Sequence, residues 1–353
     1  MRKKVLFVFD DPGGGLAVIT LIERLSKEKD LELKVYAGKL NTEILKQKKI
    51  DFINIESMIK EGIAGKIFND FNPDILISGT SGGNAEQELR NKAQEKSVKS
   101  VVILDFWKDY SRRWMYAAYE IEKLNDKVCV MDEETKKEMT EEKFNPARLI
   151  VTGNPYLDKL FNYDYDECDV NDDNENMTEN NFLFLSQPLN IIGIKDYKIH
   201  PLEILLQSLS EFSKKQNHKI NLNIRLHPLE KDSDEMNKLI SNYDRDNLSV
   251  QISANDESLK DQIRRSEAVI GFNTIAMFES RAMGRRTISL NVVPVKNSLI
   301  NAMLSAGIEI VSLEKDELLN CLSKKYTDKK KRNIFAGGIE NCARVVLNEL
   351  NLN

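Results

Sequence analysis

Two adjacent carboxylates, Asp10 and Asp11, follow the apolar run KVLFVF, and three glycines, Gly13, Gly14 and Gly15, come shortly after them. A carboxylate at the end of a strand is placed to accept a proton from a hydroxyl group, as a general base does. Glycines at the start of a helix let backbone N–H groups approach an anion or a polar sugar. The segment therefore predicts a ligand-binding turn with Asp10 or Asp11 as catalytic base. The alternatives are a turn that needs glycine for geometry alone and an N-cap role for Asp11.

Polar side chains follow two further apolar runs in the first half of the chain. The run ILIS is followed by Thr80 and Ser81, whose hydroxyl groups can bind a phosphate or a sugar or can cap a helix. The run VVIL is followed by Asp105, Trp107 and Arg112, which combine an acid, a ring that can stack on a sugar, and a fixed positive charge. The alternative for the tryptophan is a place in the core, where aromatic side chains are common.

A histidine has a similar position in the second half of the sequence. The run KINLNIRL contains Arg225, and His227 and Pro228 follow it closely. Proline biases the preceding residue toward an extended conformation, so the imidazole is expected at the carboxyl edge of a strand. There it can donate to a phosphate oxygen or assist a leaving group. The alternative is a strand-end histidine bonded to a backbone carbonyl.

Residues 267–292, EAVIGFNTIAMFESRAMGRRTISLNV, combine a buried strand, a helix and a second strand. The first strand ends at Gly271, and Asn273 is the expected N-cap of the helix. The helix N-terminus at Asn273 and Thr274 offers N–H groups and a hydroxyl to a phosphate. Glu279 comes six residues after Asn273, about 9 Å along the helix axis, and a carboxylate pairs well with two ribose hydroxyls. The alternative is that Glu279 pairs with a nearby arginine.

The elements that position these residues alternate along the chain as short aliphatic runs and amphipathic helical patterns. Such alternation predicts an α/β protein of two doubly wound, Rossmann-like domains, with ligands at the carboxyl ends of the strands in a central cleft. The predicted parts are an N-terminal domain over 1–160, an acidic linker over 161–181, a C-terminal domain over 182–325 and a C-terminal helix over 326–353. That helix is expected to pack toward the N-terminal domain.

Composition excludes several classes of protein. The 353 residues carry a net charge of −5, with 51 Lys and Arg against 56 Asp and Glu, which argues against a nucleic-acid partner. The four cysteines are scattered, so neither a zinc site nor a disulfide framework is predicted. Since the sequence contains neither an apolar run long enough to span a bilayer nor a signal peptide, a cytoplasmic protein without a transmembrane segment is expected.

Three segments resemble a known superfamily. EAVIGFNTIAMFESRAMGRRTISL resembles the donor-nucleotide segment of GT-B glycosyltransferases and of the non-hydrolysing UDP-N-acetylglucosamine 2-epimerases, which share that fold. DPGGGLAVITLIERL resembles the glycine-rich first loop of the superfamily, with Leu16 where a histidine often stands, and VTGNPYLD resembles the segment that closes its N-terminal domain. The acidic pair, SQPL and RLHP are similar to motifs of bacterial sialyl- and Kdo-type transferases.

The resemblance implies a GT-B-like fold and a glycosyltransferase that moves a sugar from a UDP- or CMP-sugar to a glycan or lipid-linked acceptor in surface polysaccharide synthesis. Asp10 or Asp11 would deprotonate the acceptor, and His227 would stabilise the leaving phosphate. The expected donor-binding residues are Gly13, Gly14, Gly15, Arg225, Gly271, Asn273, Thr274 and Glu279, and the expected acceptor or cleft residues are Thr80, Ser81, Asp105, Trp107 and Arg112.

Helix dipoles and side chains can stabilise the charge of the leaving group, so neither an essential metal ion nor a cofactor is expected. The alternatives to glycosyl transfer are a UDP-sugar 2-epimerase or hydrolase on the same scaffold and a non-catalytic protein that binds a nucleotide-sugar. The expected location is the cytoplasm, with the inner membrane face as the place where a lipid-linked acceptor would be met. The sequence predicts no oligomeric state.

Overall fold

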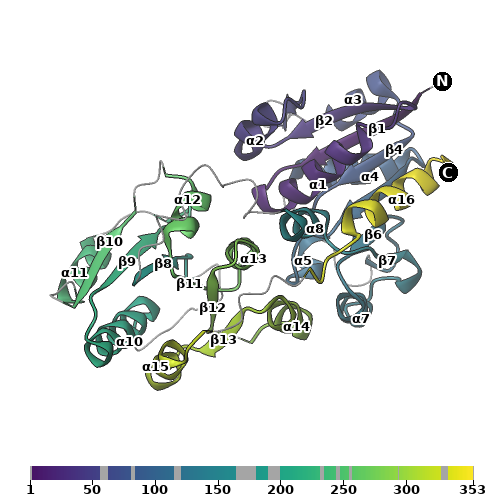
Figure 1. Ribbon diagram of the computed structural model, residues 1–353. Coiled ribbons are helices and arrows are strands. Elements are labelled where there is room, and N and C mark those ends of the chain that lie inside the picture. Colours follow the sequence, from purple (N-terminus) through teal and green to yellow (C-terminus); the bar gives the residue numbers. More distant parts are fainter. Residues whose placement is uncertain are drawn as a thin grey trace. The chain divides into compact units, whose positions relative to one another are not determined.

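A computed structural model describes residues 2–55, 63–80, 84–114, 121–163, 180–189, 199–230, 234–243, 247–253, 257–292, 294–326 and 333–352. The chain divides into two compact units. Unit 1 comprises Met1–Asn162 and Asn333–Asn353, and unit 2 comprises Tyr163–Arg332. Each unit is a parallel sheet accompanied by helices (Figure 1).

The sheet of unit 1 has seven strands in the order β3-β2-β1-β4-β5-β6-β7, all parallel. The strands are β1 (Lys3–Phe9), β2 (Leu31–Ala37), β3 (Ile53–Asn54), β4 (Ile75–Ser78), β5 (Lys99–Ile103), β6 (Lys127–Val130) and β7 (Leu149–Val151). The helices are α1 (Pro12–Leu25), α2 (Thr42–Gln47), α3 (Ile63–Phe71), α4 (Asn84–Glu95), α5 (Tyr110–Trp114), α7 (Glu133–Glu141), α8 (Pro155–Asn162) and α16 (Gly338–Glu349), with short 3₁₀ turns at Lys39–Asn41 and Pro146–Arg148. The strand order reverses between β1 and β4.

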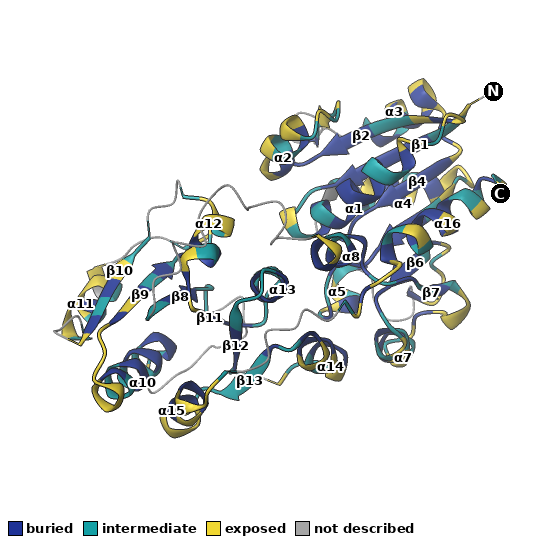
Figure 2. Cartoon of the chain, in the orientation of Figure 1, coloured by how far each residue is buried: buried dark blue, intermediate teal, exposed yellow. Residues whose placement is uncertain are grey.

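The central strand β1 is apolar on both sides because helices cover both faces of the sheet. Val5, Phe7 and Phe9 pack on one face with apolar residues of α1 and α16. Leu6 and Val8 pack on the other face with α3 and α4. The strands lie in the buried interior, whereas α3 and α4 carry exposed residues on their outer sides (Figure 2).

The C-terminal helix α16 belongs to unit 1, although unit 2 separates the two in sequence. It packs against α1 and α8. Arg24 Nε donates to Glu340 Oε1 over 2.7 Å, and the Ile339 amide donates to Asp158 Oδ2 over 3.0 Å. The start of α16 is close-packed, because a Cβ on Gly338 would lie 2.9 Å from the backbone oxygen of Asn154.

Replacing Gly338 by alanine is therefore expected to lower the free energy of unfolding by about 1–3 kcal/mol, since the backbone of Asn154 has to shift. Gly65 in α3 is the matched control, because no atom lies within 4 Å of the position of its Cβ. Gly65→Ala is expected to raise stability by roughly 0.5–1 kcal/mol, the usual helical difference between the two residues. Denaturant unfolding of the full chain measures both. Equal effects of the two substitutions would contradict the close packing of Gly338.

The sheet of unit 2 has six parallel strands in the order β10-β9-β8-β11-β12-β13. The strands are β8 (Asn181–Leu185), β9 (Ile220–Arg225), β10 (Leu248–Ile252), β11 (Ala268–Gly271), β12 (Arg286–Asn291) and β13 (Glu309–Ser312). The helices are α10 (Pro201–Gln216), α11 (Asp234–Tyr243), α12 (Leu259–Arg265), α13 (Ile275–Ala282), α14 (Asn297–Ala306) and α15 (Lys315–Ser323). This order matches the first six strands of the unit 1 order, β3-β2-β1-β4-β5-β6, with its reversal between β8 and β11, and β7 has no counterpart among the described strands of unit 2. The prediction of two Rossmann-like, doubly wound domains is confirmed.

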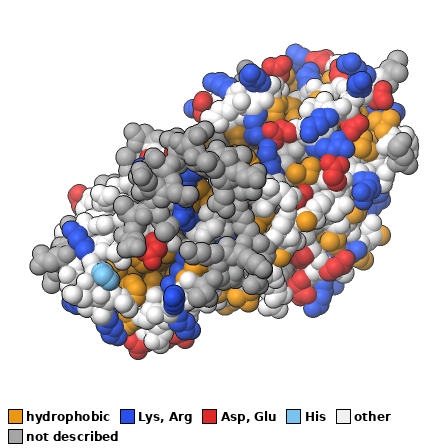
Figure 3. Space-filling model, viewed as in Figure 1, with side chains coloured by type: hydrophobic (Ala, Val, Ile, Leu, Met, Phe, Trp, Pro, Cys, Tyr) orange, Lys and Arg blue, Asp and Glu red, His pale blue; other side chains and the backbone are white. Residues whose placement is uncertain are grey.

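Acidic and basic side chains are interspersed over the visible face of unit 1 rather than separated by sign (Figure 3). Such a surface is typical of a solvated face and agrees with the small net charge of −5. Within the described parts of the chain, every helix is too short or too polar to cross a bilayer.

Candidate functional site

Polar side chains gather where the strands end in each unit, and the two groups are described separately. The unit 1 cluster consists of Asp10, Asp11, Thr80, Asp105 and Arg113. The unit 2 cluster consists of Ser186, Arg225, His227, Glu230, Thr274 and Glu279. Both adjoin the point where the strand order reverses, which is where ligands bind in open parallel sheets.

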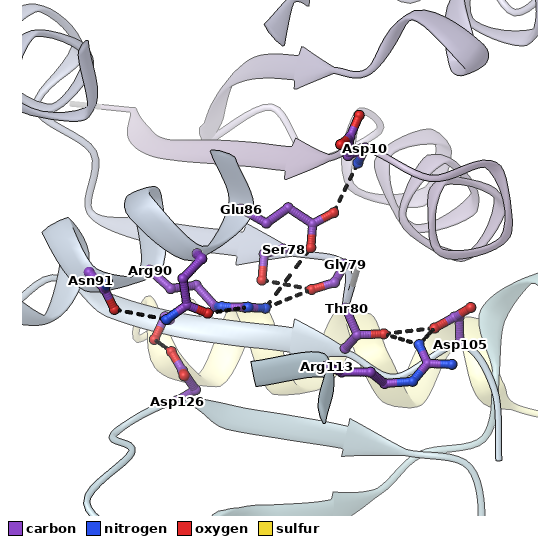
Figure 4. Close-up of polar contacts among 12 residues, drawn as sticks. Asp10, Ser78, Gly79, Thr80, Glu86, Arg90, Asn91, Asp105, Arg113 and Asp126 are labelled. Carbon is purple, nitrogen blue, oxygen red and sulfur yellow. Dashed lines mark hydrogen bonds and ion pairs between the residues drawn. The ribbon is translucent and has the colours of Figure 1, made fainter. Parts of the chain in front are cut away.

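The turn from β1 to α1 is fixed by side chains from two other elements. Asn41, which follows β2, donates through Nδ2 to the backbone oxygens of Asp10 and Asp11 over 2.8 and 3.4 Å. The Asp10 amide donates to Glu86 Oε1 of α4 over 2.9 Å, as Figure 4 shows. A Cβ on Gly38 would lie 2.1 Å from Asp10 Oδ1. The two adjacent carboxylates are therefore held on a rigid turn.

Gly13, Gly14 and Gly15 lie in the first turn of α1, and Asp11 occupies its N-cap position. A Cβ on Gly13 would lie 3.3 Å from Asp105 Oδ2 and 3.6 Å from Asp11 Oδ2. A Cβ on Gly14 would lie 2.7 Å from Asp11 Oδ1. Glycine is thus required because carboxylate oxygens approach the backbone closely, and whether these glycines also bind a ligand stays a prediction.

Two donors hold the Asp105 carboxylate in place, as Figure 4 shows. Thr80 Oγ1 donates to Asp105 Oδ1 over 2.7 Å. Arg113 Nη1 donates to the same oxygen and to Thr80 Oγ1, while Arg113 Nε donates to the backbone oxygen of Lys108 over 2.8 Å. Thr80 is 1% exposed and Asp105 is 8% exposed. The Asp105 carboxylate is therefore buried and oriented by a charge-assisted hydrogen bond.

The surroundings of Asp11 favour its protonated form. Burial raises the pKa of Asp11 most, and the charges of Asp105 and Asp10 raise it further. The Arg113 guanidinium and the Gly14 amide lower it. The result is a pKa of about 6 for Asp11, against an ordinary value of 3.8. Asp11 therefore changes charge close to neutral pH.

This shift makes stability depend on pH. Because the pKa of Asp11 is higher in the folded chain than in the unfolded chain, the ionised carboxylate costs stability as the pH rises from 3.8 through about 6. Asp11→Asn is expected to raise the free energy of unfolding by about 1–3 kcal/mol at pH 8 and by clearly less at pH 5. Urea unfolding at the two pH values measures the difference. A gain that is equal at both would mean that Asp11 has an ordinary pKa.

Two predicted members of the unit 1 site lie elsewhere. Trp107 is fully buried, packs on Phe335 and donates through Nε1 to Asp132 Oδ2 over 2.7 Å, so its ring is a core residue and is not available to stack on a sugar. Arg112 is exposed, and its neighbour Arg113 supplies the positive charge instead. The prediction for Ser81 lies outside the described residues.

In unit 2, Arg225 ends β9 with its side chain fixed in place. Nη1 donates to the backbone oxygen of Glu257 over 2.8 Å and to Gln262 Oε1 over 3.0 Å. Burial lowers the pKa of Arg225, and the charge of Glu279 opposes this. Arginine stays protonated in proteins, so a fixed cation and a carboxylate lie within electrostatic range of each other. The sequence placed both residues in one site without predicting that they interact.

His227 is oriented by the turn that follows β9. Its Nδ1 accepts a hydrogen bond from the Leu229 amide over 3.2 Å, and its own amide donates to Glu230 Oε2 over 2.8 Å. Burial lowers the pKa of His227, and Glu230 opposes this. The imidazole is therefore neutral at pH 7, and since Nδ1 accepts, the proton is on Nε2. Nε2–H is a donor suited to a phosphate oxygen.

Ser186 and Glu230 belong to this cluster but were not predicted as site residues. Ser186 Oγ donates to Glu230 Oε1 over 2.9 Å and its amide donates to the Arg225 backbone oxygen, which joins the ends of β8 and β9. The acidic residue three positions after His227 is the signal in the sequence, because that spacing suits a carboxylate that accepts from a backbone amide.

The helix α13 begins one residue later than predicted. Its N-cap is Thr274, with φ −143° and ψ 159°, and Asn273 is not the cap. Asn273 Oδ1 instead accepts from Ser289 Oγ of β12 over 2.9 Å, which turns that side chain toward the sheet. A Cβ on Gly271 would lie 3.0 Å from Met277 Sδ, so this glycine packs the strand against the helix. Thr274 and Glu279 occupy the same helix, at its start and in its second turn.

No protein-family model and no curated protein matches the sequence. Solved structures do match the fold along the whole chain. A UDP-GlcNAc 2-epimerase from Neisseria meningitidis, bound to UDP-GlcNAc, has a TM-score of 0.70 at 15% identity, covering 99% of this chain and 100% of that one. A complex of S. aureus MnaA with UDP has a TM-score of 0.71 at 14% identity, covering 100% and 98%. MurG from Acinetobacter baumannii has 0.51 at 10%, covering 99% and 95%. The chain therefore has the GT-B fold that these proteins share.

Proposed function

We propose that this chain is an enzyme that binds a UDP-sugar and acts on the sugar without an acceptor, as a 2-epimerase of the UDP-N-acetylglucosamine type or as a hydrolase. The observation that carries this proposal is the match of the whole fold to UDP-GlcNAc 2-epimerase structures, one of which holds UDP-GlcNAc. The identities are low, so the residues of the site have to support the assignment separately.

The unit 2 cluster has groups of the kinds that a nucleoside diphosphate requires. Arg225 is a fixed cation for the phosphates. The N-terminus of α13 at Thr274 favours an anion through its N–H groups and its dipole. Glu279 lies five residues further along the helix, about 7.5 Å along the axis, where a carboxylate can accept from two ribose hydroxyls. His227 adds a neutral N–H donor for a leaving phosphate.

The unit 1 cluster has groups suited to proton transfer. Epimerisation requires that a proton leaves a sugar carbon and returns to it, and hydrolysis requires that a proton leaves water. A carboxyl group that changes charge near neutral pH, as Asp11 does, can carry out either transfer. The proposal therefore assigns the nucleotide to unit 2 and the proton chemistry to unit 1.

The test is a reaction with UDP-GlcNAc and no acceptor, followed by NMR and by chromatography of the nucleotides. The expected result is the C2 epimer of the substrate, with deuterium at C2 when the solvent is D₂O, or else UDP and free sugar. Activity is expected to survive EDTA, since no metal is assigned to the step. A rise in melting temperature with UDP and no product would replace the proposal by a non-catalytic nucleotide-sugar protein.

Glycosyl transfer is the second candidate, because MurG shares the fold at a TM-score of 0.51. It predicts no consumption of UDP-GlcNAc alone and turnover only after a glycan or lipid-linked acceptor is added. CMP-sugars belong in the same panel of donors. The donor-only reaction thus separates the two candidates in one experiment.

A further inference from the structure

We propose that Asp11 is the carboxyl group of unit 1 that takes and returns a proton, and that Thr80 and Arg113 are positioning residues that act on it through Asp105. The proposal rests on the proposed function only for the identity of the proton donor, which is a UDP-sugar or a water molecule that attacks it. Its geometry lies entirely within unit 1.

The two adjacent aspartates differ in their surroundings. Asp10 has its amide bonded to Glu86 and its carboxylate over Gly38, where a Cβ would come within 2.1 Å of Oδ1. Asp11 Oδ1 is buried and has no hydrogen-bond partner among the described residues, although the Gly14 amide lies close enough to the carboxyl group to lower its pKa. A buried acceptor without a donor costs about 1–3 kcal/mol. Protonation, or a donor from a bound substrate, relieves that cost at Asp11.

Asp105 differs from Asp11 because one of its carboxylate oxygens already has two donors. Its Oδ1 accepts from both Thr80 Oγ1 and Arg113 Nη1, which hold the carboxylate in place. Its Oδ2 and Asp11 Oδ2 both lie within 3.6 Å of the position that a Cβ on Gly13 would take. Asp105 thus holds a fixed negative charge beside Asp11, across a space that only glycine leaves open.

Four further charged groups lie on the surrounding elements. Asp10 on the same turn raises the proton affinity of Asp11, and Arg113 of α5 lowers it. Glu86 and Arg90 of α4 are buried and lie 4.0 Å apart, so their charges largely compensate each other. The balance leaves the pKa of Asp11 at about 6.

In epimerisation the Asp11 carboxylate accepts the proton of sugar C2 while the C–H electrons form a C1=C2 bond and the C1–O bond to UDP breaks; the bond to UDP then re-forms as the acid form of Asp11 gives the proton to the opposite face of C2. In hydrolysis the proton comes from water, whose oxygen bonds to C1 as the C1–O bond to UDP breaks, and Asp11 then releases it. Asp11 ends either cycle in the form in which it began.

The experiment is a pH titration of the ligand-free full chain, with ¹³C-labelled aspartate carboxyl groups followed by NMR. One aspartate resonance is expected to titrate near pH 6 and to be missing in Asp11→Asn. Asp105→Asn is expected to lower the proton affinity of Asp11 by about tenfold, because it removes a neighbouring negative charge. Arg113→Met is expected to change it in the opposite direction. A midpoint near the ordinary pKa of 3.8, or two variants without opposite effects, would overturn the proposal.

No substrate enters this titration, so its outcome is independent of the proposed function. A midpoint near 6 in a chain that leaves UDP-GlcNAc unchanged would remove the proposed function alone. In an active chain, the pH profile of kcat/KM gives a second measurement. Its acidic limb is expected to shift to lower pH in Asp105→Asn and to higher pH in Arg113→Met, with Arg113→Lys restoring most of the original profile. A purely structural role would lower activity at all pH values without shifting that limb.

Discussion

Asp11→Asn is expected to lower the turnover of a UDP-sugar by roughly 10²–10⁴-fold, the usual contribution of a general acid or base. The amide fills the same space but can neither accept nor return a proton. Because the proposed nucleotide site belongs to unit 2, the affinity for UDP is expected to change by less than about twofold, so the loss falls on kcat. Steady-state kinetics and calorimetry with UDP measure the two quantities.

Asp51→Asn is the matched control, because Asp51 is an exposed carboxylate of the same unit that follows α2 rather than β1. It is expected to leave both quantities unchanged. If Asp11→Asn retained most of its turnover, the proton would have to move through another group, and the unit 1 cluster would be structural. Loss of UDP affinity in Asp11→Asn would instead place the nucleotide against the turn after β1.

Asp11→Asn is also expected to stabilise the chain at pH 8, because the surroundings that raise the pKa of Asp11 make its ionised form unfavourable. An ionised carboxylate kept beside Asp105 and away from water is unfavourable for folding and favourable for accepting a proton. Such opposite effects on stability and activity are common at functional sites. A variant that is both more stable and less active would link the two measurements to one group.

The fold could be predicted from the sequence because the alternation of buried strands and amphipathic helices is a local pattern. β1 has five consecutive buried positions, Val5–Phe9, which only a sheet covered on both faces provides. The carboxyl ends of parallel strands then meet at one edge, so Asp11, Thr80 and Asp105 could be placed in one site by their order alone. How the two predicted domains face each other stays a prediction.

The site predictions that the structure contradicts depend on contacts that differ between neighbouring residues of the chain. Arg112 and Arg113 are adjacent, and only the orientation of the five-residue helix α5 determines which one meets Asp105. Asn273 and Thr274 are both good N-caps, and a tertiary bond to Ser289 decides between them. Trp107 follows a strand as a ligand-stacking ring would, yet its indole N–H has a partner in Asp132. None of these contacts is visible in local sequence.

The nucleotide assignment of unit 2 predicts that Glu279→Gln weakens UDP binding by about 10–100-fold, the value of hydrogen bonds to a charged acceptor. The sharper test compares UDP with 2′-deoxy-UDP in calorimetry. The original chain is expected to prefer UDP, because Glu279 accepts from the ribose hydroxyls, and the preference is expected to disappear in the variant. Glu314→Gln, an exposed carboxylate of the same unit, is expected to keep it.

Arg225→Met tests whether unit 2 also recognises the phosphates of UDP. It is expected to weaken UDP binding by about tenfold or more while leaving the weak affinity for uridine unchanged, because only the phosphates need its charge. The two substitutions thus separate recognition of the ribose from recognition of the diphosphate. If Glu279→Gln kept the preference for UDP over its deoxy form, Glu279 would serve only to balance the charge of Arg225, and the ribose would bind elsewhere.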